Sequence, residues 1–202
     1  MGLLNFFTGD KKNEIIAKAQ TCKGWTTNKQ LSFMYDQLNS VKSLDGDILE
    51  IGSAWGRSVV MMGLASTRKI WSIDPHTGGI AYILKKEEQN SFDEFKQNVQ
   101  KFNLISRVQV LKNTTQEVID DKLMPENVRF AFAFIDGLHT ADGVKVDIEF
   151  AFPRMIKGGI IMFDDYFKPS VSDMKEMIDE MAAKYKVELV KIPECDLVYF
   201  IK

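Results

Sequence analysis

The sequence predicts an α/β fold in which a doubly wound, mostly parallel sheet of seven strands carries helices on both faces. Short runs rich in β-branched and aromatic residues alternate with segments whose apolar residues recur at helical spacing. Strands that alternate with helices form βαβ units, which build parallel sheets covered on both sides. The last two runs, 187–192 and 197–201, are too close for a helical crossover. We therefore expect them to form a C-terminal antiparallel hairpin.

Each element follows from its own pattern. Leu31, Met34 and Leu38 recur on one face of a helix, as do Phe95 and Val99. The expected helices are 13–20, 28–43, 57–66, 87–103, 115–122, 143–155 and 170–185. The expected strands are 47–51, 69–74, 108–112, 130–136, 159–163, 187–192 and 197–201.

Length and composition indicate one ordinary globular domain. We expect the 202 residues to form a helical cover over 1–45 and an α/β core over 46–202. The net charge of -2 gives no basic bias toward nucleic acid. Cys22 and Cys195 lie far apart, which favours a reducing, cytoplasmic setting. The apolar start is too short for a signal peptide or membrane span, so no membrane partner is expected. The sequence leaves the oligomeric state open, a homo-oligomer included.

Acidic residues stand at the ends of four of the expected strands. They are Glu50, Asp74, Asp136 and the pair Asp164 and Asp165. In an open parallel sheet, ligands bind outside the carboxyl ends of the strands. These acids therefore predict an active-site rim along one edge of the sheet, with scattered surface carboxylates as the alternative.

A glycine turn follows the first strand, from Glu50 to Gly56. Ala54 and Arg57 replace two glycines of the dinucleotide fingerprint G-x-G-x-x-G, which disfavours a pyrophosphate cradle and a dehydrogenase. The spacing G-x-x-x-G instead resembles motif I of class I S-adenosylmethionine-dependent methyltransferases. The resemblance implies that Gly52, Ser53 and Gly56 lie under the amino-acid part of S-adenosyl-L-methionine, and that Glu50 holds its ammonium group. A plain strand-to-helix turn is the alternative.

Further residues extend the cofactor hypothesis. Asp74 lies 22 residues beyond Gly52, where a carboxylate can accept both hydroxyls of a ribose. We interpret His76 as a loop residue rather than a catalyst. Thr114 and Thr115 follow the third strand, where the methyltransferase family contacts adenine. Capping of the next helix explains these two threonines equally well.

Asp136, Asp164 and Asp165 are expected to converge, because adjacent parallel strands end side by side. Carboxylates this close repel one another unless a cation neutralises them. Hard oxygen ligands favour Mg²⁺, Ca²⁺ or Mn²⁺, so the cluster predicts a divalent-metal site, with Mg²⁺ as the expected ion. The alternative is that one acid binds metal or substrate and another, most readily Asp165, caps a helix.

The combined pattern I-D-G-x-H, V-x-x-D, G-G-x-I and D-D-Y between residues 47 and 166 resembles small class I methyltransferases that act on sugar hydroxyls or related diols. The resemblance implies magnesium ligands at Asp136, Asp164 and Asp165, and a general base at His139. A structural or substrate-positioning role for His139 stays open. The predicted activity is metal-assisted O-methylation of a small-molecule acceptor.

Other functions fit parts of the pattern. The acceptor could be a catechol-like phenol or a small carboxylate, or the protein could bind the cofactor without catalysis. Nucleic-acid methylation is disfavoured, because no Asn/Asp-Pro-Pro-aromatic stretch follows the fourth strand. Residues 75–91 form a Gly-containing insertion that we interpret as a lid or a surface linker.

Overall fold

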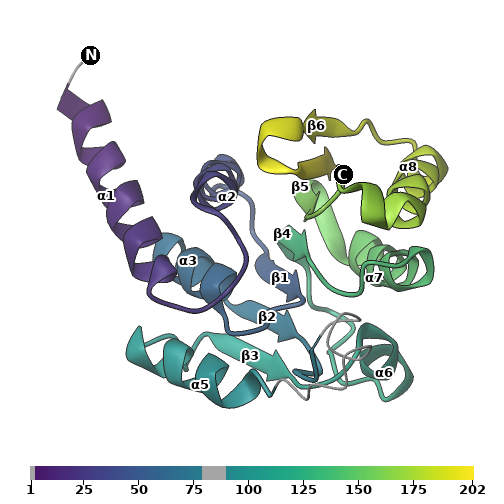
Figure 1. Ribbon diagram of the computed structural model, residues 1–202, viewed down its shortest axis with the longest axis horizontal. Helices are drawn as coiled ribbons and strands as arrows, with labels where there is room; N and C mark the ends of the chain where they lie inside the picture. The colour runs from purple at the N-terminus through teal and green to yellow at the C-terminus, as the bar shows by residue number, and fades with distance from the viewer. Residues whose placement is uncertain (1–2, 79–89) are drawn as a thin grey trace.

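A computed structural model describes residues 3–78 and 90–202, with side chains from residue 11 onward. The expected insertion therefore falls largely outside the described residues. The seven strands form one sheet in the order β3-β2-β1-β4-β5-β7-β6 (Figure 1). They are β1 (Asp47–Ile51), β2 (Ile70–Ile73), β3 (Val108–Leu111), β4 (Phe130–Ile135), β5 (Met155–Phe163), β6 (Val190–Ile192) and β7 (Leu197–Ile201).

Strand direction agrees with the sequence prediction. β1 pairs in parallel with both β2 and β4, β2 with β3, and β4 with β5. β7 runs antiparallel between β5 and β6, which confirms the C-terminal hairpin. The strand order reverses at β1, so the topological switch point, where such sheets bind ligands, lies between β1 and β4.

Helices cover both faces of the sheet (Figure 1). They are α1 (Leu3–Gln20), α2 (Asn28–Ser40), α3 (Arg57–Ala65), α5 (Phe92–Lys101), α6 (Thr115–Asp120), α7 (Ala141–Arg154) and α8 (Ser172–Tyr185). Leu31 of α2, Val59 of α3 and Phe95 of α5 belong to one buried cluster. Ile148 of α7 and Ile178 of α8 belong to the other, on the opposite face. The sheet therefore lies between two apolar layers.

Several boundaries differ from the sequence prediction. α1 begins at Leu3 rather than at residue 13, and β5 begins at Met155 rather than at residue 159. The chain passes through Gly158 at a φ of 84°, and the amide of Gly158 donates to the Lys202 carbonyl at 2.7 Å, so pairing continues. Among the described residues, no helix is long and apolar enough to cross a membrane.

Candidate active site

The strand ends place the predicted acids at one edge of the sheet. Ile51 at the end of β1 pairs with Ile73 of β2 and Ile135 of β4, and Ile135 pairs with Phe163 of β5. The ladder continues one residue further: the amide of Asp136 donates to the Ile51 carbonyl at 2.8 Å, and that of Asp164 to the Ile135 carbonyl at 3.1 Å. The residues that follow these strands therefore form a continuous rim.

The glycine turn is packed tightly against this rim. Gly52 has a φ of 90°, and a Cβ on it would lie 2.0 Å from the carbonyl oxygen of Asp136. Only glycine fits at this position. Gly56 has a φ of 87° and precedes the first residue of α3. Ser53 is buried and its hydroxyl lies 2.7 Å from that of Ser72. The turn thus brings backbone close to the switch point, as cofactor binding requires.

Glu50 is fully buried beneath the turn, and both of its carboxylate oxygens lack a hydrogen-bond partner of normal geometry. Burial raises the pKa of Glu50 to about 8, and the nearby hydroxyls of Ser58 and Ser53 offset only part of that rise. Such a group needs a proton or a cationic partner. Glu50 can therefore bind a cationic ligand group at this edge.

Asp74 anchors the rim at the end of β2. One of its carboxylate oxygens accepts from the amide of Ala54 at 2.7 Å, and the other from the amide of His76 at 2.6 Å. Each oxygen keeps a lone pair for a ligand hydroxyl. His76 is buried, and its Nδ1 lies 2.8 Å from the hydroxyl of Ser91. Burial lowers the pKa of His76, so its imidazole is neutral and packs as part of the rim.

The two threonines after β3 have different environments. The hydroxyl of Thr114 accepts from the amide of Glu117 at 3.2 Å, and the Glu117 carboxylate accepts from the amide of Thr114 at 2.7 Å. This capping box starts α6 and accounts for the side chain of Thr114. Thr115 is buried at the first position of the helix.

The half of the rim that follows β4 and β5 contains a histidine between two aspartates. His139 Nε2 lies 3.2 Å from Asp136 Oδ1, and its Nδ1 lies 3.2 Å from Asp165 Oδ2. Lys168 forms an ion pair with the other oxygen of Asp165. Burial lowers the pKa of His139, but the two carboxylates outweigh burial and leave that pKa raised. The raised pKa favours the imidazolium form of His139, which lies between the two carboxylates.

Asp164 and Asp165 are both buried. Burial raises the pKa of Asp164 to about 9, with the charges of Asp136 and Asp165 adding to the rise. Burial also raises the pKa of Asp136, against the opposing contact with His139. Among the described side chains, no three acidic, histidine or cysteine groups are arranged as metal ligands. The three predicted ligands gather at one place, but His139 and Lys168 balance their charge here.

Sequence reasoning missed two contributors to the site. Gln30, near the start of α2, donates from Nε2 to Asp164 Oδ1 at 2.5 Å. The segment 21–27, which we call the strap, lies over the glycine turn and leaves a cavity of only about 10 Å³ beside Asp136. Trp25 of the strap packs on Trp55 of the turn with ring centroids 4.6 Å apart. The capping pattern of Thr27 and Gln30 predicts a helix start but carries no signal for these distant contacts.

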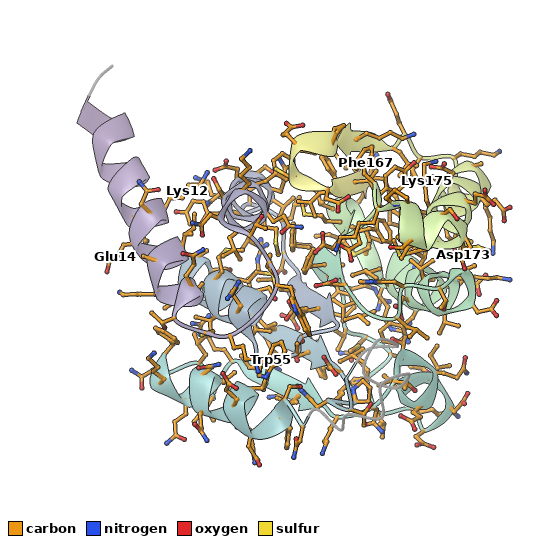
Figure 2. All side chains as sticks on the ribbon, viewed as in Figure 1. Lys12, Glu14, Trp55, Phe167, Asp173 and Lys175 are labelled. Carbon is orange, nitrogen blue, oxygen red and sulfur yellow. The ribbon has the colours of Figure 1, made fainter. Side chains whose placement is uncertain are left out.

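The rim extends from the glycine turn to the loop after β5. Figure 2 labels Trp55 near β2 and Phe167 near the end of β5, well separated in the view. Asp136 and His139 follow β4, whose place in the sheet is between β1 and β5. Two ligands can therefore bind along one edge, one over the turn and one over the acid cluster.

Residues 49–166 match a protein family described as a methyltransferase domain. The chain belongs to this methyltransferase family. The match covers more than half of the 202 residues and includes the glycine turn and the acid cluster. It confirms the resemblance to class I methyltransferases and the enzyme class that the sequence predicted. No curated protein sequence matches the chain significantly.

Solved methyltransferase structures share the fold. The O-methyltransferase NovP superposes with a TM-score of 0.76 at 20% identity, over 89% of this chain and 83% of NovP. An O-methyltransferase from Bacillus cereus, solved with SAH, superposes with a TM-score of 0.68 at 16% identity, over 96% of this chain and 90% of the other. CalS11, a TDP-rhamnose 3'-O-methyltransferase, superposes with a TM-score of 0.63 at 18% identity, over 96% of this chain and 93% of CalS11. The methyltransferase Rossmann-like fold is therefore confirmed.

Proposed function

We propose that this methyltransferase transfers the methyl group of S-adenosyl-L-methionine to a hydroxyl oxygen of a sugar or other small diol-type acceptor. The observation that carries the proposal is the division of one rim into two halves. Glu50, which is buried without a hydrogen bond of normal geometry, suits the cofactor's ammonium group, and we assign His139 and the three acids to the acceptor. The sugar acceptor is supported by the fold shared with CalS11.

The cofactor half has a role for each predicted residue. Glu50 pairs with the ammonium group, and the backbone of Gly52, Ser53 and Gly56 lies against the amino-acid part. Asp74 accepts the ribose hydroxyls. Thr115 contacts the adenine, and Thr114 contributes through its backbone because its side chain caps α6. These assignments depend on the glycine turn, where a Cβ on Gly52 would clash with Asp136.

On the acceptor half, His139 removes the proton of the hydroxyl as its oxygen bonds to the methyl carbon. The carbon–sulfur bond breaks in the same step, and S-adenosylhomocysteine leaves. Since both imidazole nitrogens contact carboxylates, one contact must open and His139 must lose its proton before it can act as a base. Rates limited by this step rise with pH through the raised pKa of His139.

A divalent metal is part of the proposal. The oxygen donors of Asp136, Asp164 and Asp165 suit Mg²⁺. Burial raises the pKa of Asp164 to about 9 and the charges of Asp136 and Asp165 add to the rise, so a cation among the three acids would relieve their repulsion. Bound there, Mg²⁺ would lower the pKa of an acceptor hydroxyl. Cation binding at these acids requires rearrangement of Lys168 and His139, which now neutralise Asp165. Turnover that EDTA leaves unchanged would exclude the metal.

Calorimetry with S-adenosylhomocysteine tests the cofactor, and absence of binding at millimolar concentration would refute the proposed function. Release of S-adenosylhomocysteine from S-adenosylmethionine, measured with nucleotide-linked sugars and with catechols, then distinguishes the two acceptor classes. A protein that binds the cofactor but turns over neither class supports the non-catalytic alternative.

His139→Gln is expected to lower turnover at least 100-fold while S-adenosylhomocysteine affinity stays unchanged, because general-base catalysis typically contributes that factor. Leu138→Ala, at the exposed neighbouring position, is the matched control and should keep near wild-type turnover. Undiminished turnover of His139→Gln would leave His139 a positioning role only.

A further inference from the structure

The strap, residues 21–27, occupies the approach to the cofactor half of the rim. Residues 23–26 line the same small cavity as the glycine turn and Asp136, and only about 10 Å³ is open there. This space holds no more than about one water molecule, whereas drug-sized ligands need several hundred Å³. A ligand the size of S-adenosylmethionine does not fit into this space while the strap lies against the turn.

Arg57, at the start of α3, holds the strap at both ends. Its Nε donates to the carbonyl of Cys22 at 3.0 Å, and its Nη1 donates to the carbonyl of Thr26 at 2.9 Å. Lys23 lies over the ring of Trp55 at 4.4 Å. These contacts attach the strap to the turn that it covers.

Gln30 attaches the strap to the acceptor half as well. Its Oε1 accepts from the amide of Thr27 at 2.7 Å, at the end of the strap. Its Nε2 donates to Asp164 Oδ1 at 2.5 Å, and both groups are buried. One side chain therefore joins the segment over the cofactor site to an acid of the acceptor cluster.

We propose that Gln30 is a positioning residue that latches the strap closed through Asp164, so that a cofactor entering over Gly52 displaces the strap and reorients the acceptor acids. The inference rests on the proposed function for the identity of the ligand. It predicts ordered binding, with the cofactor first, because displacement of the strap precedes the final placement of Asp164.

The test uses trypsin cleavage after Lys23, an exposed residue of the strap, followed by mass spectrometry. Gln30→Glu keeps the oxygen that caps Thr27 and replaces the amide donor to Asp164 with a second carboxyl oxygen. Cleavage at Lys23 should accelerate at least fivefold in this variant with little change in melting temperature. Gln37→Ala, a half-buried glutamine of the same helix, is the matched control and should be cleaved at the wild-type rate.

Two variants of Asp164, which accepts the hydrogen bond from Gln30, complete the test. Asp164→Ala should accelerate cleavage as much as Gln30→Glu does, and the double variant should be no faster than either. Asp164→Asn keeps an acceptor oxygen for Gln30 and should restore slow cleavage. Wild-type cleavage rates in both Gln30→Glu and Asp164→Ala, or additive effects in the double variant, would overturn the latch.

S-adenosylhomocysteine at saturation should accelerate cleavage of the wild-type protein at Lys23, because the ligand displaces the strap. Unchanged or slower cleavage would overturn the displacement. If calorimetry shows no S-adenosylhomocysteine binding, the proposed function fails, and the ligand-free comparison of variants still decides whether Gln30 latches the strap.

Discussion

Glu50→Gln is expected to stabilise the ligand-free protein. Burial raises the pKa of Glu50 to about 8 from an ordinary 4.5. A raised carboxyl pKa means that the contribution of Glu50 to stability is greatest below pH 4.5 and is lost as the pH rises through 8. Each pH unit in that window corresponds to about 1.4 kcal/mol, so the loss is about 3 kcal/mol at pH 7 and about 5 kcal/mol above pH 8. Glutamine has a similar shape and no charge, which removes this loss.

Urea unfolding of both proteins between pH 4 and pH 9 measures the effect. The free energies of unfolding should nearly coincide at about pH 4 and separate by about 3 kcal/mol at pH 7. Glu176→Gln, at an exposed position of α8, is the control that should leave the pH profile unchanged. A variant less stable than wild type at pH 8, or a difference that does not vary with pH, would refute the reasoning.

Glu50→Gln also tests whether the buried carboxylate contributes to ligand binding. Under the proposed function, Glu50→Gln weakens S-adenosylhomocysteine binding about 30-fold, because a hydrogen bond to a buried charged group is worth about 2 kcal/mol. Calorimetry at pH 7 measures the change. Higher stability with weaker binding would show that the fold tolerates an unfavourable carboxylate because the ligand needs it.

Three further substitutions test the surrounding structure by urea unfolding. Asp147→Asn should raise the free energy of unfolding by up to about 3 kcal/mol at pH 7 and not at all below pH 3.8, because burial raises the pKa of Asp147 to about 6. A pH-independent difference would contradict this cause. Thr114→Ala should lower stability by about 1 kcal/mol through loss of the capping box, while Gln116→Ala on the same exposed helix turn should change it little. Lys202→Met should also lower the free energy of unfolding by about 1 kcal/mol, because the Lys202 ammonium donates to three carbonyls at the end of α7. Equal stability of the variant and the wild type would show that this cap contributes nothing.

The sequence predicts most of the fold because its strands are buried on both faces. Every residue of β4 from Phe130 to Ile135 is buried, as is every residue of β2. Such continuous apolar runs, separated by helical patterns, specify a parallel sheet. The extra turns of α1 were missed because Thr8, Gly9 and Asp10 weaken the helical pattern before residue 13.

The rim was predictable for a related reason. Strand register is set by apolar pairing, so an acid that directly follows Ile135 or Phe163 must lie at the carboxyl edge. The roles of these acids stay predictions, but their convergence follows from local sequence. For Thr114 the sequence left helix capping and adenine contact equally open, and the structure shows the capping box with Glu117.

The contacts that close the site depend on tertiary packing instead. Gln30 and Asp164 are 134 residues apart, and nothing near Gln30 distinguishes its amide from that of an ordinary capping residue. The same holds for the strap, whose carbonyls are bound by Arg57 only because α1, α2 and α3 pack together. Sequence patterns therefore locate the acids at the strand ends, whereas the contacts of Gln30 and of the strap depend on how α1, α2 and α3 pack together. The convergence of the acids is therefore predictable from the sequence, whereas the proposed latch between Gln30 and Asp164 can be recognised only in the structure.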